Sequence, residues 1–139
     1  MNTGTSFAAT LGRILMSSLF LMSGFGKLVD PVGTKAYIAS RALPWPDGAF
    51  VVAVIIEIGF GTALALGYRT RIVALVMAVF TLATALTFHD NYADPKQLIS
   101  FMKNIAIIGG FLQVMVLGAG SASLDAWLAA RKQRVPARV

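Results

Sequence analysis

A single carboxylate, Glu57, lies within an apolar run at residues 51–66 that is long enough to cross a bilayer. Insertion scales put the cost of Asp, Lys or Arg at the middle of a membrane helix at about +2.5 to +3.5 kcal/mol. We therefore expect Glu57 to be paired with a basic or amide group from a neighbouring helix, or to stay protonated.

Depth along the helices selects the groups that can meet Glu57. At about 1.5 Å per residue, Glu57 lies roughly 10–13 Å below the outer start of its helix. By the same arithmetic Lys103 and Asn104 lie about 8–12 Å below the outer start of theirs, and Lys27 and His89 end their helices at that boundary. All four predicted helices thus bring polar groups to one half of the molecule.

Two hypotheses follow from this constellation. In the structural one, Glu57 and Lys103 form a buried ion pair that fixes helix register, since removing one partner of such a pair costs about 3–5 kcal/mol. In the functional one, the groups line an outward-facing pocket for a small apolar molecule with a polar head, such as a quinone. His89 or Lys103 would bind a carbonyl, and Glu57 or His89 would exchange protons. Arg13, nearer the cytoplasmic end, could reach toward Glu57 or extend to the inner headgroups.

The elements that position these residues are membrane-spanning helices. Hydrophobic residues make up 57% of the 139 and charged residues only 13%, against about 25% in soluble domains. The apolar stretches predict helices at about 7–28, 49–68, 72–88 and 95–117. We expect one all-α membrane domain over residues 1–139, an antiparallel up-down four-helix bundle. A short interfacial helix at 35–41 occupies the first outer loop, and an amphipathic, basic tail covers 121–139.

The basic residues set the expected orientation. Seven lie on the side of the termini and five on the other side, which by the positive-inside rule places both termini in the cytoplasm. The first group is Arg13, Arg69, Arg71, Arg131, Lys132, Arg134 and Arg138, and the second is Lys27, Lys35, Arg41, Lys96 and Lys103.

Several classes of function are disfavoured. The chain has no cysteine, which excludes disulfides, thiolate chemistry and Cys-ligated metals. With a single histidine, we expect no metal site. The net charge of +6 comes from residues between and after the apolar runs, as in membrane topology, so we expect no nucleic-acid partner.

The ordered motifs of the chain resemble the DoxX family of small four-helix bacterial membrane proteins. The resemblance covers about residues 10–125 and rests on Arg13, residues 20–28 (FLMSGFGKL), 57–61 (EIGFG), 66–67 (LG), 88–89 (FH), 103–106 (KNIA), 109–110 (GG) and 118–125 (GAGSASLD). It implies a cytoplasmic-membrane protein, related to proteins linked with thiosulfate:quinone oxidoreductase and with membrane oxidoreductase assemblies involved in redox stress. The polar residues that match its motifs are Arg13, Lys27, Glu57, His89, Lys103 and Asn104.

The leading functional prediction is a membrane subunit of a redox system that binds quinone in the polar pocket. Glu57 and His89 are the catalytic candidates, and Arg13, Lys27, Lys103 and Asn104 the ligand-binding ones. The alternatives are a non-catalytic scaffold that recruits a partner oxidoreductase, or a small-molecule or lipid carrier, so the sequence leaves open whether the chain is an enzyme. Expected partners are the lipid bilayer, a membrane or periplasmic protein, and a second copy of the chain. Without cysteine, thiosulfate oxidation would need a partner.

Overall fold

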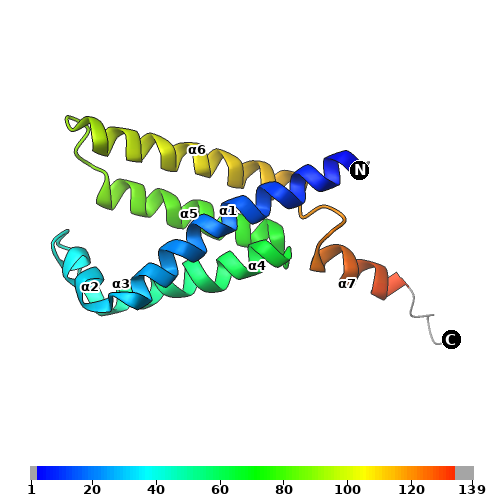
Figure 1. Cartoon of the computed structure of the whole chain (residues 1–139), viewed down its shortest axis with the longest axis horizontal. Coiled ribbons are helices and arrows are strands. Elements are labelled where there is room, and N and C mark those ends of the chain that lie inside the picture. The colour runs from blue at the N-terminus through cyan, green and yellow to red at the C-terminus, as the bar shows by residue number, and fades with distance from the viewer. Residues whose placement is uncertain (1–2, 134–139) are drawn as a thin grey trace.

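The computed structural model describes residues 3–133, and this part of the chain consists of helices and their connections (Figure 1). Four rods are long and apolar enough to cross a membrane, judged by length and composition. They are α1 (Thr3–Val29), the second rod formed by α3 (Pro46–Val54), η1 (Ile55–Phe60) and α4 (Gly61–Leu66), then α5 (Thr70–Phe88) and α6 (Pro95–Leu117). Two short helices are α2 (Pro31–Ala39) and α7 (Leu124–Gln133). The prediction of an all-α membrane bundle is confirmed.

The helix boundaries agree closely with those expected from the sequence. The bounds of α6 are those predicted, whereas α1 is longer at both ends and the second rod begins at Pro46 rather than at residue 49. The helix of the first outer loop covers 31–39 instead of 35–41. Of the predicted tail at 121–139, residues 134–139 with Arg134 and Arg138 lie outside the described residues.

The rods are arranged as two pairs. α1 packs along the second rod, and α5 packs along α6 with the most extensive interface in the bundle. The chain runs up and down, so α7 lies at the same end as the start of α1, and α2 lies at the opposite end against α3 (Figure 1).

Caps at the α2 end direct the chain into its next helix. Asp30 ends α1, and its carboxylate accepts a hydrogen bond from the Gly33 backbone N–H at 2.9 Å before Pro31 opens α2. Asp94 does the same for α6, accepting from the Lys96 N–H at 2.9 Å with Pro95 at the first helical position. Proline suits this position because the first N–H groups of a helix have no intrahelical partner.

The apolar core joins the two helix pairs in the middle of the bundle. Leu64, Met77 and Phe111 are fully buried, and Phe20 meets Phe111 with ring centroids 5.4 Å apart. This core closes the molecule below the region that contains the predicted polar cluster.

A π-helical turn, η1, interrupts the second rod. The sequence predicts one continuous helix over about residues 49–68 at this place. The turn spans Ile55–Phe60 and contains Glu57. Such turns widen a helix locally and occur frequently at functional sites.

Candidate ligand-binding site

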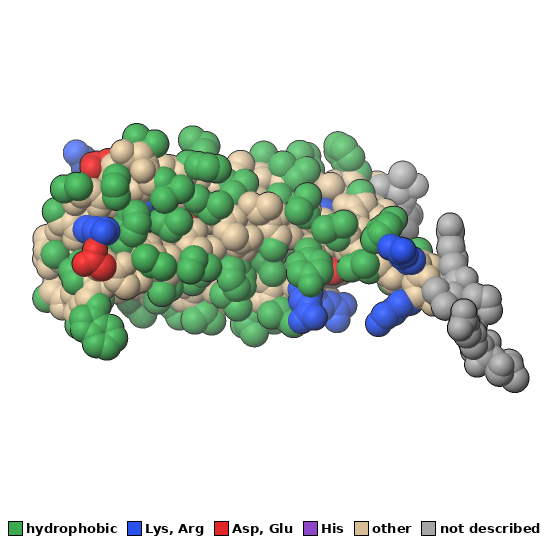
Figure 2. Space-filling model, turned by 90° about the horizontal axis from the view of Figure 1, so that it is seen from below, with side chains coloured by type: hydrophobic (Ala, Val, Ile, Leu, Met, Phe, Trp, Pro, Cys, Tyr) green, Lys and Arg blue, Asp and Glu red, His purple; other side chains and the backbone are tan. Residues whose placement is uncertain are grey.

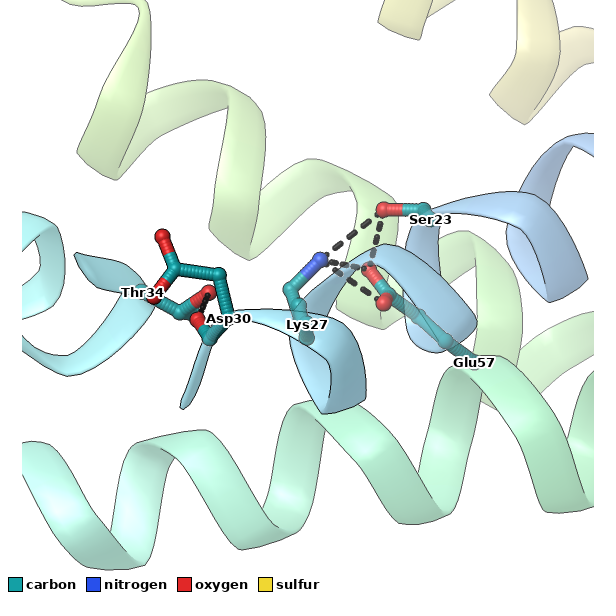
Figure 3. A network of polar contacts seen from close by, with 5 residues as sticks. All are labelled: Ser23, Lys27, Asp30, Thr34 and Glu57. Atoms are coloured by element: carbon teal, nitrogen blue, oxygen red, sulfur yellow. Dashed lines mark hydrogen bonds and ion pairs between the residues drawn. The ribbon is translucent and has the colours of Figure 1, made fainter. Parts of the chain in front are cut away.

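Glu57 is paired with Lys27 of α1 (Figure 3). The Lys27 ammonium donates to both carboxylate oxygens, at 2.8 Å to Oε1 and 2.7 Å to Oε2. The Ser23 hydroxyl donates to Oε1 at 3.2 Å and accepts from Lys27 at 2.8 Å. The Glu57 residue is only 5% exposed, so its charge is removed from solvent and held by a short, charge-assisted network.

Local packing explains why α1 supplies the partner. Ser23 and Lys27 are four residues apart and therefore share one face of α1. Gly24 lies between them, and a Cβ there would come within 2.6 Å of Ile58 Cγ1 and 3.0 Å of Glu57 Cβ. The glycine thus allows α1 to approach η1 closely enough for Lys27 to reach the carboxylate.

The predicted pairing of Glu57 with Lys103 is wrong. Lys103 is exposed on α6, and α1 rather than α6 packs against η1. The prediction used depth along the helix and left out direction around its axis, and Lys103 is turned to the surface. Lys27, predicted to sit at the boundary, reaches inward instead.

A cavity of about 810 Å³ adjoins the ion pair. It lies at the α2 end of the bundle, where all the long rods and α2 contribute to its wall. Its polar lining includes Ser23, Lys27, Asp30, Thr34, Tyr37, Glu57, Thr84, Thr87, His89 and Asn104, and its apolar lining includes Phe20, Ile38, Ala53, Phe80, Phe88 and Ile107. The cavity thus brings together four of the six predicted site residues: Lys27, Glu57, His89 and Asn104.

His89 and Asn104 each keep part of their hydrogen-bonding capacity for the cavity. His89 Nδ1 lies 2.9 Å from Gln97 Oε1, so with Nδ1 as the donor its Nε2 is left as an acceptor. The Asn104 amide nitrogen donates to the Ser100 carbonyl at 3.1 Å, which leaves the Asn104 amide oxygen to accept a bond. Both side chains can therefore orient a bound polar group.

Arg13 lies at the other end of the bundle. Its side chain is 1% exposed and neither contacts Glu57 nor extends to headgroups, so both sequence expectations for it are wrong. Its guanidinium donates to the carbonyls of Leu64 at 3.1 Å and Ala65 at 3.3 Å, and to Ala122 at 2.8 Å. Arg13 thereby caps the carboxyl end of α4, whose last carbonyls have no intrahelical partner, and holds the segment before α7.

Gly67 and Asp125 complete this clasp around Arg13. Gly67 adopts φ +69°, and a Cβ there would collide with the Arg13 guanidinium. The Asp125 carboxylate accepts from the backbone N–H groups of Arg69 at 2.7 Å and Thr70 at 2.9 Å. Burial alone would raise the pKa of Asp125, but the hydrogen bonds from Thr70 and Arg69 and the charge of Arg13 together hold its pKa below the usual value.

Sequence reasoning missed two residues of the cavity region. Ser23 was interpreted as a small residue for helix packing, although its spacing of four from Lys27 indicates a shared face. Gln97, which holds His89, was not singled out. It lies on the first turn of α6 immediately after the loop that follows His89, so the shortness of that loop was the available signal.

Four apolar spans, a buried ion pair and a cavity between the helix pairs together define a multi-pass helical membrane protein with a partly open, largely apolar cavity that has an ion pair in its wall. The model of the DoxX family matches residues 8–90, and the chain belongs to this family. The matched range contains Arg13, Lys27, Glu57 and His89.

Two relatives come from Escherichia coli (strain K12). The chain is 40% identical to the inner membrane protein YqjF over 115 residues, which covers 83% of this chain and 87% of YqjF. It is 34% identical to the inner membrane protein YphA over 120 residues, covering 83% of this chain and 86% of YphA. No solved structure was found to match the chain.

Proposed function

We propose that this protein is an inner-membrane subunit of a redox system and binds a quinone, or a similar small apolar molecule with polar groups, in the cavity beside Glu57. The observation that carries the proposal is a cavity of about 810 Å³ with the Lys27–Glu57 pair in its wall. Ligand pockets typically measure about 300–1,000 Å³ and combine apolar walls with a few placed polar groups.

The chemistry of the lining suits a quinone. Phe20, Phe80 and Phe88 offer apolar and aromatic surface to a ring, and Lys27 can donate a hydrogen bond to a carbonyl oxygen. Reduction of a quinone to a quinol takes up two electrons and two protons. Among the titratable groups of the lining, Glu57 and His89 are the ones assigned here to exchange these protons, and a redox partner protein supplies the electrons.

Two alternatives predict different behaviour. In the scaffold alternative the ion pair is purely structural, and the observation in its favour is that Lys27 and Ser23 already satisfy both oxygens of Glu57. The carrier alternative requires a path through the bundle. The lining of the cavity ends at Phe20, Phe80 and Ile107, and the side chains of Met77 and Phe111 beyond it are fully buried, which speaks against a carrier.

The test is to analyse a lipid extract of the purified protein for quinones and to titrate the protein with a short-chain ubiquinone or menaquinone. We expect quinone to co-purify with the wild type and to be lost from Glu57→Gln. Lys103→Gln is the matched control, because Lys103 is a basic residue of similar depth outside the cavity lining. A cooperative thermal melt of Glu57→Gln with its midpoint well above the temperature of the binding assay separates loss of binding from loss of folding. Quinone-free wild type that also fails to bind added quinone would refute the proposal and favour the scaffold.

A further inference from the structure

The two ends of the bundle treat their basic residues differently. At the α2 end, three of the five basic residues form ion pairs: Lys27 with Glu57 at 2.7 Å, Lys35 with Asp47 at 2.6 Å and Arg41 with Asp90 at 3.1 Å. Lys96 and Lys103 at that end form none within the described part of the chain. At the end of the termini, Arg69, Arg71, Arg131 and Lys132 have no carboxylate within 4.0 Å among residues 3–133. In Figure 2, blue and red side chains touch at the α2 end, whereas blue predominates toward the end of the termini, with a single small red patch in view there.

Two of these unpaired arginines line a groove. The groove has a volume of about 510 Å³ and lies where the turn between α4 and α5 meets the end of α6. Arg69, Thr70 and Arg71 form its polar side, together with Asp125, and Ile72 and Leu117 form its apolar side. At the end of two membrane spans, the basic groups of the groove match a lipid headgroup, and the neighbouring apolar surface matches the acyl chains.

The arginine charges in the groove remain available. Both oxygens of Asp125 accept backbone N–H groups, so this carboxylate does not hold the guanidinium of Arg69 or Arg71. Arg71 lies against Gly118, where a Cβ would be 3.7 Å from its Nε, and Gly118 has φ +80°. Arg69 is held over the Tyr68 ring, 5.9 Å from the centroid.

The surroundings of the groove point to a membrane lipid rather than a soluble anion. Ile72 and Leu117 are 57% and 65% exposed on the outer surface of spans that face lipid. On α7, Trp127 and Leu128 are exposed as well, and Arg131 lies 5.4 Å from the Trp127 ring centroid. Amphipathic helices with aromatic and basic residues of this kind lie in the headgroup region of a membrane.

We infer that this groove binds the phosphate headgroup of an anionic phospholipid, from the leaflet that meets the end of the termini. Arg69 and Arg71 bind the headgroup, and Ile72 and Leu117 contact an acyl chain. Arg131 and Lys132 on α7 strengthen the attraction to the lipid headgroups, because each basic residue near an anionic membrane surface adds favourable binding free energy. The site is independent of the cavity, which lies at the opposite end of the bundle.

The experiment is native mass spectrometry of detergent-purified protein incubated with an equimolar mixture of phosphatidylglycerol and phosphatidylcholine of identical chains. We expect the wild type to retain phosphatidylglycerol preferentially, and Arg71→Gln to weaken this retention about fivefold, the equivalent of about 1 kcal/mol for one charge. Arg71→Lys should keep most of the retention, which shows that a folded variant with the charge still binds.

The controls decide between a site and general attraction. Lys96→Gln removes a basic residue at the other end and should leave retention unchanged. Glycerol phosphate, the headgroup chemistry without chains, should not displace the lipid at equal concentration. Equal retention of the two lipids by the wild type, or equal effects of Arg71→Gln and Lys96→Gln, would overturn the inference. Displacement by glycerol phosphate would assign the groove to a soluble phosphate compound instead.

Discussion

Removing Lys27 should destabilise the protein far more than removing any other basic residue of the outer half. In Lys27→Met, Glu57 keeps only the bond from Ser23 while remaining 5% exposed. Breaking a buried pair by truncating one partner typically costs about 3–5 kcal/mol. The Lys27 side chain is itself 22% exposed, which admits some water to the pair, so we expect a loss of about 3 kcal/mol in the free energy of unfolding.

The opposite truncation should cost less. In Glu57→Gln the lysine is left without its carboxylate, but its long, partly exposed side chain can turn toward the α2 end and regain solvent. We expect a loss of about 1 kcal/mol. The double variant, with both Lys27→Met and Glu57→Gln, should lose about 1–3 kcal/mol less unfolding free energy than the two single variants lose in sum, as is usual for residues in direct contact.

Equilibrium unfolding in mixed micelles, followed by circular dichroism, measures these free energies. Lys103→Met is the control: both lysines lie in the half of their spans nearer α2, but Lys103 is exposed on α6. Exposed substitutions usually stay within about 0.5 kcal/mol of the wild type. If Lys103→Met cost as much as Lys27→Met, or if the two single effects were strictly additive, the ion pair described above would not be what holds α1 against η1.

Three further predictions concern the glycines and the clasp around Arg13. Gly24→Ala should force α1 away from η1 and lower the unfolding temperature, because the new Cβ would lie 2.6 Å from Ile58 Cγ1. Gly12→Ala is the control, since a Cβ there meets nothing within 4 Å, and it should not lower the unfolding temperature. Equal melting curves for the two variants would refute the close approach of α1 to η1. Gly67→Ala places a side chain at φ +69° and against the Arg13 guanidinium. It should lower the free energy of unfolding by more than about 2 kcal/mol in the same assay. A loss below about 0.5 kcal/mol would contradict the clasp around Arg13. The pKa of Asp125 lies below the usual 3.8, so the stabilisation by its carboxylate is fully present above pH 3.8 and is lost as the pH falls through the lower folded-state pKa. The gap in melting temperature between wild type and Asp125→Asn should therefore be larger at pH 7 than at pH 2.5. A gap that widens on acidification would show the opposite sign.

The fold could be predicted from the sequence because it follows from long apolar runs and from residues that start and stop helices. Apolar runs of sufficient length leave few alternatives in lipid, and Asp30-Pro31 and Asp94-Pro95 mark helix starts with chemistry that is local in sequence. The π-helical turn could not be predicted, since the residues around Glu57 are as compatible with a regular α-helix as with a wider turn.

The candidate site could be predicted in its depth but not in its pairing. Rise per residue placed Lys27, Glu57, His89 and Asn104 in the same half of the bundle, and all four line the cavity. Rotation about each helix axis depends on which neighbour packs closest, and this was decided by Gly24, a residue without a side chain. Arg13 lies at the end of the bundle that carries the termini, as expected, but its partners are backbone carbonyls, which no residue pattern reveals.

The wide turn in the second rod has a consequence for how that rod can change. Residues on either side of η1 are out of phase with an unbroken helix, since a turn closed by i→i+5 bonds takes up one residue more than its neighbours. Deleting a single residue of this turn other than Glu57 would restore a regular α-helix and leave the faces of α3 and α4 in their present phase, because the wide turn takes up its extra residue locally. The α3 side chains that line the cavity and the Arg13 clasp on α4 would keep their directions, and the change would be confined to the backbone around Glu57. A length change of one residue there would therefore remove the local widening beside the Lys27–Glu57 pair and spare the bundle.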